Sequence, residues 1–256
     1  MGRFPNIAAA KAATGAAKGK LYGMYAREIY QVAKSGGATP EGNPSLKRLI
    51  EKAKKEQVPA DVIKRALDKV NSGVDESFET LNYEVFGPNG STLIVSCLTD
   101  NPNRSISSVK AVLNKCKCKI GVQGSVSFNY DNLCIVGVKG TDEESVMNAL
   151  IENDCDIEDI ENDNGIIMIY GNPKDLFAIK NAITSSLGIK EFEIDEISML
   201  PKEKITLEGD DLELFKRLYN MLDEVEDVKN IYHNVELYIQ LGLAGHIHDL
   251  FVGIGK

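Results

Sequence analysis

The hydrophobic positions between Leu21 and Lys34 recur at the spacing of an α-helix. Wound as a helix, this stretch carries an apolar stripe on one side, and Lys20, Arg27 and Lys34 recur every seven residues on the other. One face can therefore dock on a protein core while the opposite face stays cationic. For three isolated bases an ordinary solvated face is the simpler interpretation, so the charge pattern of the whole chain has to be considered.

The sequence before this helix is rich in alanine, lysine and glycine. Gly15 and Gly19 interrupt it and predict a break before Leu21. Lys11 and Lys18 are accordingly assigned to a separate basic arm or short first helix. On one continuous helix they would point into the apolar stripe, and a mobile basic arm suits a search for phosphates.

Two further helices are expected after the Ser35-Gly36-Gly37 break. Asn43 is the predicted N-cap of the second, with Pro44 at its first position, and the third opens at Pro59. Each has an apolar stripe, and the rest of the second helix is crowded with lysine and arginine. Three helices with short connections predict a small bundle over residues 1–74.

From residue 78 the hydrophobic spacing changes to that of strands. Residues 81–86 and 91–98 flank Gly87-Pro88-Asn89-Gly90 and predict a hairpin, a helix is expected near 104–115, and the alternation at 122–130 predicts another strand. Residues 202–235 predict a strand, a helix and a strand. Together, 78–130 and 202–235 are interpreted as a discontinuous α/β middle domain.

Residues 131–201 follow a different order of elements. Strand, helix, strand, strand, helix, strand is the βαββαβ order of ferredoxin-like domains, with Asp163-Asn164-Gly165 as the central turn. The sequence therefore predicts an α+β protein: an N-terminal helical bundle, a discontinuous α/β middle domain and an inserted ferredoxin-like domain. Residues 236–256 are interpreted as an extension.

Charge is distributed unevenly along the chain. Residues 1–74 hold fourteen Lys or Arg against six Asp or Glu, whereas the remainder holds fifteen against thirty-two. A basic module is thus hidden within a chain whose net charge is −9. Because phosphate neutralisation supplies most non-specific affinity for nucleic acid, this end is expected to meet a polyanion.

Composition excludes several other classes. No window reaches the roughly 18 apolar residues of a membrane span, and the N-terminus lacks the unbroken apolar run of a secretory signal. The five cysteines are scattered, which favours a cytoplasmic protein with free thiols. Cys116-Lys117-Cys118 lacks the matching ligands of a zinc site, so no metal or other cofactor is predicted. No spacing typical of a catalytic triad or phosphate loop appears, and the protein is not expected to be an enzyme.

Several blocks resemble a known family. "YEVFGPNGSTLIVSCLTDNPNRSISSVK", "GVQGSVSFNY" and "VKNIYHNV" are similar to the YebC family of probable transcriptional regulatory proteins, related to a mitochondrial translational activator, and the opening "MGRFPNIAAAKAATGAAKGKLYGMYAREIY" resembles its second branch. The resemblance runs from Gly2 to about Val235. It implies a three-domain fold and action on gene expression, either as a DNA-bound regulator or as a ribosome-associated factor that relieves stalling at consecutive prolines.

The block from Asp100 to Arg104 is the most specific part of that resemblance. It lies between a strand and a helix, where Asn103 could cap the helix and Asp100 could hold Arg104. A tightly hydrogen-bonded turn and direct contact of Arg104 with RNA both remain open.

The leading hypothesis is a non-enzymatic, ribosome- or RNA-associated translation factor. Its predicted nucleic-acid-binding residues are Lys11, Lys18, Lys20, Arg27, Lys34 and Arg104. A DNA-binding transcriptional regulator is the alternative, although the third helix offers mainly Asp61, Lys64, Arg65 and Asp68 outward. The third possibility is a ligand-sensing or enzymatic ferredoxin-like protein, which would require a convergent polar pocket. No membrane partner is expected.

Overall fold

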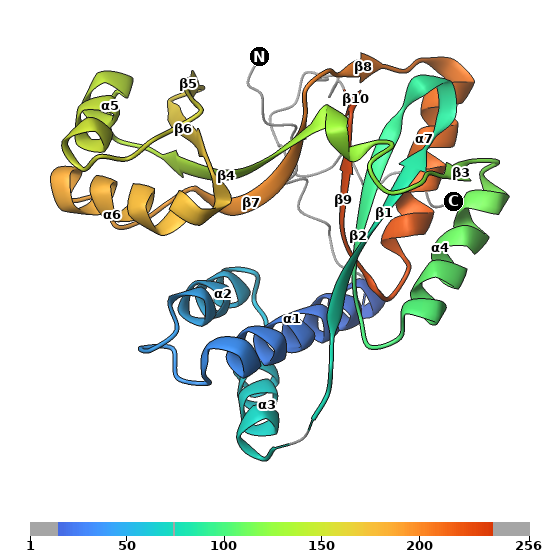
Figure 1. Ribbon diagram of the computed structural model, residues 1–256, viewed down its shortest axis with the longest axis horizontal. Coiled ribbons are helices and arrows are strands. Elements are labelled where there is room, and N and C mark those ends of the chain that lie inside the picture. Colours follow the sequence, from blue (N-terminus) through green and yellow to red (C-terminus); the bar gives the residue numbers. More distant parts are fainter. Residues whose placement is uncertain (1–14, 74, 238–256) are drawn as a thin grey trace. The chain divides into compact units, whose positions relative to one another are not determined.

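The computed structural model describes residues 15–73 and 75–237, and it shows the predicted α+β class (Figure 1). Within these residues the chain forms two compact units. One comprises 126–206 with 232–237, and the other comprises 15–73 and 75–125 with 207–231. Among the described helices, none is long and apolar enough to cross a membrane. Lys11 and residues 238–256 of the predicted extension lie outside the described residues.

The N-terminal helical domain consists of α1 (Gly15–Gly36), α2 (Pro44–Lys55) and α3 (Ala60–Asn71). Both α2 and α3 pack against α1 (Figure 1). The buried residues come from the predicted apolar stripes: Tyr25, Ile29, Ala33, Leu46, Ile50, Ala53, Val58, Ile63 and Ala66. This arrangement confirms the predicted three-helix bundle.

Asn43 joins two of these helices. As predicted it is the N-cap of α2, where its Oδ1 accepts a hydrogen bond from the Leu46 amide at 3.1 Å. Its Nδ2 also donates to the carbonyl oxygens of Val32, at 3.1 Å, and Gly37, at 3.0 Å, at the end of α1. One buried side chain therefore fixes the turn between α1 and α2.

The predicted break before Leu21 is wrong. The helix α1 runs without interruption from Gly15 through Gly19 and Leu21, so Lys18 belongs to the same helix as Lys20. Lys18 is exposed and Leu21 only partly buried, so this end of the helix lies at the margin of the core. A lysine on the apolar side therefore meets no steric or desolvation penalty there, and the conflict expected from the sequence does not arise.

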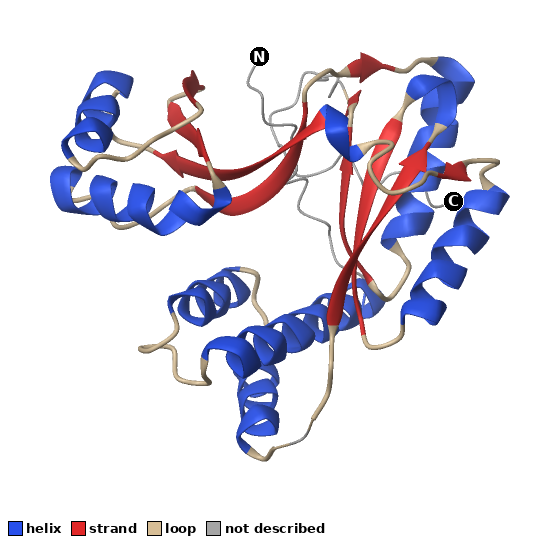
Figure 2. Cartoon of the chain, in the orientation of Figure 1, coloured by secondary structure: helices blue, strands red, loops and turns tan. Residues whose placement is uncertain are grey.

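The middle domain is a four-stranded sheet with two helices. It consists of β1 (Glu79–Phe86), β2 (Thr92–Thr99), α4 (Pro102–Lys115), β3 (Lys119–Ile120), α7 (Gly209–Asp223) and β9 (Val228–His233). The strand order is β3-β1-β2-β9, and α4 and α7 lie side by side (Figure 2). The predicted hairpin is present: β1 and β2 are antiparallel, joined through η1 (Pro88–Gly90), with Asn89 at φ 47°.

The predicted strand over residues 122–130 is wrong in its first part. After β3 the chain forms a tight loop and then η2 (Ser127–Asn129), and the next strand begins only at Tyr130. The loop is held by Glu84, whose backbone oxygen accepts from the Gly121 amide at 2.7 Å and whose Oε1 accepts from the Gly124 amide at 2.6 Å. These bonds take the amides that a strand would have paired.

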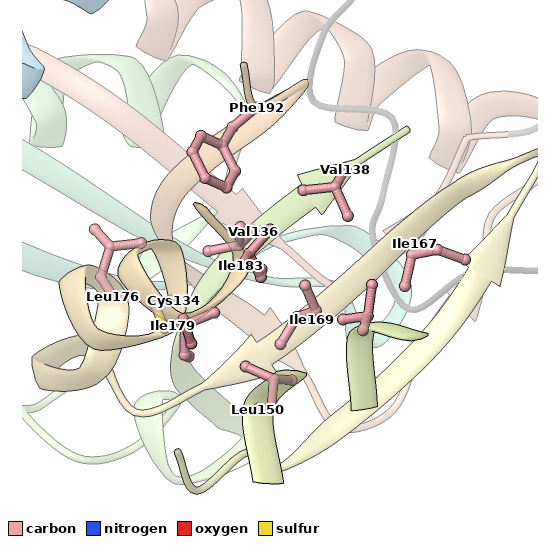
Figure 3. Packing of buried hydrophobic residues seen from close by; sticks show 12 residues of the cluster. Cys134, Val136, Val138, Leu150, Ile167, Ile169, Leu176, Ile179, Ile183 and Phe192 are labelled. Atoms are coloured by element: carbon pink, nitrogen blue, oxygen red, sulfur yellow. The ribbon is translucent and has the colours of Figure 1, made fainter. Parts of the chain in front are cut away.

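The inserted domain has the predicted ferredoxin-like order. Its elements are β4 (Tyr130–Val138), α5 (Glu143–Glu152), β5 (Asp159–Asp163), β6 (Ile166–Gly171), η3 (Pro173–Asp175), α6 (Leu176–Leu187) and β7 (Ile194–Pro201). The strands are antiparallel in the order β5-β6-β4-β7. The two helices bury an apolar core that includes Val136, Ile169 and Ile183 (Figure 3).

A two-stranded sheet completes the fold. The predicted strand near Lys204 is only β8 (Ile205–Thr206), and it pairs in parallel with β10 (Val235–Glu236) rather than joining the sheet of the middle domain.

Candidate nucleic-acid interface

The three bases that recur every seven residues along α1 form ion pairs and hydrogen bonds with the middle domain and with the segment leading to it. Lys20 donates to the backbone oxygen of Asp223, and Arg27 pairs with Glu226 and with Asp227, the latter at 3.2 Å. Lys34 pairs with Asp75 and donates to the Glu76 carbonyl at 2.8 Å. The same face also carries Glu28, which pairs with Lys229. The cationic stripe predicted from the sequence is therefore the side of α1 that faces protein.

Asp227 is the centre of these contacts, and its side chain is only 2% exposed. Arg104 binds it through two nitrogens, with Nη2 2.7 Å from Oδ1 and Nε 3.0 Å from Oδ2. Ser105 donates to Oδ2 at 2.8 Å, and Arg27 approaches Oδ1 from α1. One buried carboxylate thus receives donors from both α1 and α4; we refer to Arg27, Arg104, Ser105 and Asp227 as the Asp227 cluster.

The pKa values in this cluster follow from these donors. Burial by itself would raise the pKa of Asp227, but the hydrogen bonds from Arg104 and Ser105 outweigh it and hold the pKa below the ordinary value. Hydrogen bonds to Asp227 and Asp100 raise the pKa of Arg104. Both residues therefore remain charged, and the cluster is a structural ion pair rather than a source of exchangeable protons.

The turn before α4 explains how Arg104 is oriented. Asn101, not Asn103, is the N-cap of α4: its Oδ1 accepts from the Arg104 amide at 3.1 Å, and Pro102 occupies the first helical position. The expected link between Asp100 and Arg104 is present at 2.7 Å. Asn103 is displaced from the cap because the helix begins two residues earlier than the sequence indicated.

The bases of α2 face solvent instead. Its buried residues Leu46, Ile50 and Ala53 occupy one side, and the opposite side carries Lys47, Arg48, Lys52, Lys54 and Lys55 with Glu51 as the one acidic residue of the helix. Lys47, Lys52 and Lys54 are exposed, and none of them forms an ion pair with any described residue. We call these three residues the α2 lysine face.

Helix stability does not explain this face completely. Lysines in the last turn complement the negative end of the helix dipole, which suits Lys52 and Lys54. Lys47 lies near the positive end, where a cation is unfavourable and where the first turn holds no acidic residue. Lys47 therefore adds positive charge to the solvent-facing side of α2 without stabilising the helix.

A shallow hollow of about 310 Å³ lies between α1 and the turn after α7. It is lined by Gly19, Lys20, Gly23, Arg27, Glu224 and Glu226. Because its two basic residues already bond to the middle domain, the hollow is a gap beside those contacts rather than a convergent polar pocket. It does not supply the ligand site that the third function would require.

Thiol and metal chemistry find no support among the described residues. Burial raises the pKa of Cys97 to about 12 and that of Cys118 to about 11, so these thiols stay protonated near neutral pH. Within 15–73 and 75–237, no three histidine, cysteine, aspartate or glutamate side chains are arranged to bind a metal ion.

The structure thus brings together Lys20, Arg27 and Arg104, all close to the turn around Asp227, and leaves Lys18 exposed elsewhere on α1. Sequence reasoning did not identify Asp227, which lies 123 residues after Arg104. No local motif marks a residue with such a distant partner. Asp227 lies only one residue before "VKNIYHNV", so this short terminal block was the available signal.

Comparison with known proteins agrees with the fold. The model of the TACO1/YebC protein N-terminal domain matches residues 2–73, and the model of the TACO1/YebC second and third domain matches residues 78–235. A probable transcriptional regulatory protein of Alcanivorax borkumensis is 43% identical over 238 residues, which cover 93% of this chain and 100% of that protein. A protein of the same description from Marinobacter nauticus is 44% identical, with 93% and 99% covered.

A solved structure is similar over nearly the same range. The crystal structure of the conserved hypothetical protein Aq1575 from Aquifex aeolicus has 30% sequence identity and a TM-score of 0.75, and the match covers 94% of this chain and 99% of that one. The two family models together span almost all of residues 2–235. The chain therefore belongs to the TACO1/YebC family.

Proposed function

We propose that this chain is a non-enzymatic gene-expression factor that binds ribosomal RNA through its helical domain and relieves stalled translation. The observation that carries the proposal is the α2 lysine face: Lys47, Lys52 and Lys54 are exposed and unpaired among the described residues. Lys20, Arg27 and Lys34 of α1 are instead bonded to other parts of the protein. Lys18, exposed on α1, and Lys11 are assigned to the same RNA contact.

This surface suits RNA because it offers positive charge but no recognition helix that could read a base sequence. Phosphate recognition needs exposed cations and no base-specific donors. The net negative charge of the middle and inserted domains would repel a polyanion. Binding is therefore confined to basic surfaces, of which the helical domain supplies one.

A DNA-binding regulator is the second candidate, because the relatives are described as probable transcriptional regulatory proteins. The outward face of α3 offers it little. Arg65 is tied to Asp61 of the same helix at 2.7 Å, and Asp68 beside them adds negative charge where a recognition helix needs donors.

Co-sedimentation with ribosomes tests the proposed contact. We expect simultaneous Lys47→Glu, Lys52→Glu and Lys54→Glu substitutions to weaken association about a hundredfold at 0.1 M salt, because each phosphate contact contributes about fivefold. The matched control reverses Lys139, Lys174 and Lys190 of the inserted domain and should sediment like the unaltered protein. Association that survives reversal of the α2 lysine face would refute the assignment.

Two further measurements address the process. Ribosome profiling of a strain that lacks the protein should show pauses at consecutive proline codons, and an unchanged distribution of ribosomes would contradict the stalling role. For the DNA alternative, a duplex would have to be preferred over random sequence by at least about a thousandfold. Such a preference, together with no ribosome association, would replace our proposal.

A further inference from the structure

One segment of the acidic middle domain contains no acidic residue. Between Asp100 and Asp131 the chain has Arg104, Lys110, Lys115, Lys117 and Lys119 and neither aspartate nor glutamate. Arg104 belongs to the Asp227 cluster, whereas the four lysines are exposed and form no ion pair with a described residue. Three of them lie within five residues of one another, at the end of α4 and the start of β3.

Lys117 has an unusual backbone. At φ 55° it is in the left-handed region, where glycine is favoured and a lysine costs about 1 kcal/mol in stability. The turn that holds it is well defined, because the Cys118 amide donates to the Leu113 carbonyl at 2.9 Å in a helix-ending motif. The backbone at this point would be more stable with glycine, so the conformation itself does not account for the lysine.

An exposed aromatic ring lies next to these lysines. Phe86, at the end of β1, is 42% exposed and pairs across the strands with Lys119. Its ring packs over Gly121: a Cβ at Gly121 would lie 2.9 Å from Phe86 Cε2. The absence of a side chain at Gly121 therefore lets the ring lie where it does, beside a lysine.

The loop that follows Gly121 is held by hydrogen bonds and exposes Val122 at its tip. Glu84 is buried and anchors the loop through the Gly121 and Gly124 amides, and Ser125 closes it by donating to the Val122 carbonyl from both its amide, at 3.1 Å, and its hydroxyl, at 2.6 Å. Val122 at the tip is 77% exposed. An apolar side chain is thus held outward by a hydrogen-bonded loop rather than buried.

On this basis we propose a second RNA-binding surface on the middle domain, which binds a short single-stranded segment. It comprises Phe86, Lys115, Lys117, Lys119, Val122 and Gln123, and we call it the α4–β3 surface. The lysines neutralise successive phosphates, Phe86 offers a ring on which an unpaired base stacks, and Val122 adds an exposed apolar side chain. Arg217 of α7 adds positive charge, since it and Lys115 both lie close enough to Cys116 to lower its pKa, although burial raises that pKa overall.

An ordinary solvated surface explains the lysines but not their setting. Solvating lysines are commonly interspersed with acids, require no strained backbone and do not need an exposed ring beside them. Single-stranded nucleic acid is bound by positive charge combined with exposed rings on which bases stack, and this surface supplies both. The inference extends the proposed function by assigning an RNA contact to a second site, separate from the α2 lysine face.

Fluorescence anisotropy with the full-length chain and a labelled 12-nucleotide oligouridylate tests the surface. We expect the combined Lys115→Ala, Lys117→Ala and Lys119→Ala protein to bind about a hundredfold more weakly at 0.1 M salt, with a salt dependence reduced by about two in the log–log slope. The control with alanine at Lys139, Lys174 and Lys190 has the same net charge and should bind within about twofold of the unaltered chain. Equal weakening in the two variants would overturn the inference.

Lys117→Gly separates binding from folding. Glycine relieves the left-handed strain, so the variant should unfold about 3 °C higher while binding RNA about fivefold more weakly. Asp154, at φ 52° in the same kind of helix end after α5, supplies the matched control. Asp154→Gly should also raise the Tm but leave RNA affinity unchanged. A Lys117→Gly protein that binds like the unaltered chain would show that the lysine has no such role.

Phe86→Leu tests the stacking platform, since it keeps an apolar contact with Gly121 but removes the ring. About tenfold weaker binding of the single strand is expected, with no change in salt dependence. Unchanged binding would exclude stacking. If oligouridylate binding ignores the α4–β3 variants while ribosome association still depends on the α2 lysine face, this inference fails and the proposed function stands; the opposite pattern would refute the α2 assignment alone.

Discussion

The helices α1 and α2 are neighbours in one bundle and both carry rows of basic residues, but the two rows have different partners. On α1, Lys20, Arg27 and Lys34 bond to residues of the middle domain and of the segment leading to it. On α2, Lys47, Lys52 and Lys54 have no ion-pair partner among the described residues. Helical periodicity identifies a charged face, but whether that face meets protein or solvent depends on distant residues.

The two rows of basic residues also differ in how exposed their side chains are to solvent. The Arg27 side chain is 18% exposed and meets a carboxylate that is nearly inaccessible, whereas the α2 lysine face is open to water. Charges inside the protein interact strongly and must be paired, whereas exposed charges contribute little to folding and are available for a partner. We therefore expect changes at Arg27 of α1 to act on stability and changes on the α2 lysine face to act on binding.

Removal of the shared carboxylate should have the largest effect on stability. Asp227→Asn leaves Arg27 and Arg104 without their common partner, and we expect a loss of about 3 kcal/mol in the free energy of unfolding, since both arginines retain some access to water. Urea denaturation measures it. Glu226→Gln, at a side chain that is 72% exposed, is the control and should cost no more than about 0.5 kcal/mol. Similar losses in both variants would contradict the central role of Asp227.

Arg27→Ala should cost less, about 1 to 2 kcal/mol, because Asp227 retains Arg104 and Ser105. The comparison with α2 is direct: Lys54→Ala should change the free energy of unfolding by no more than about 0.5 kcal/mol. The same urea titrations measure both variants. If Lys54→Ala proved as destabilising as Arg27→Ala, the distinction between a protein-facing and a solvent-facing row would be lost.

The contacts of Arg27 mark the limit of what the sequence could predict. The apolar stripe of α1, the Asn43 cap and the βαββαβ order are set by residues close in the chain, and each was predicted correctly. The partners of Arg27 lie about two hundred residues away. Local spacing cannot reveal them, so the stripe was interpreted as an external surface.

Two local errors have the same origin. The alternating pattern at 122–130 favoured a strand, but the Glu84 side chain took the Gly124 amide and held a loop. Gly19 favoured a break, but in α1 it is simply an exposed helical residue. In both cases the neighbouring sequence gave a weak preference, and a contact or its absence in three dimensions decided the outcome.

Low pH should remove part of what Asp227 contributes to the free energy of unfolding. Because the pKa of Asp227 is lower in the folded protein than in the unfolded chain, its ion pairs stabilise the protein fully at pH values well above the unfolded-state pKa. That stabilisation is lost as the pH falls through the folded-state pKa. Urea denaturation between pH 6 and pH 3 should show the difference between the unaltered protein and Asp227→Asn narrowing below pH 4. A difference that stays constant down to pH 3 would mean that Asp227 titrates alike in both states.

Substitution of Lys34 should have the smallest effect on stability, although Lys34 lies on the same stripe of α1 as Arg27 and seven residues after it. Its partner Asp75 has a side chain that is 87% exposed, so water and salt screen the pair. Lys34→Ala should therefore leave the urea midpoint unchanged within error at 0.15 M salt. A midpoint shift as large as that of Arg27→Ala would show that position along the stripe, rather than burial of the partner, determines what a base on α1 contributes.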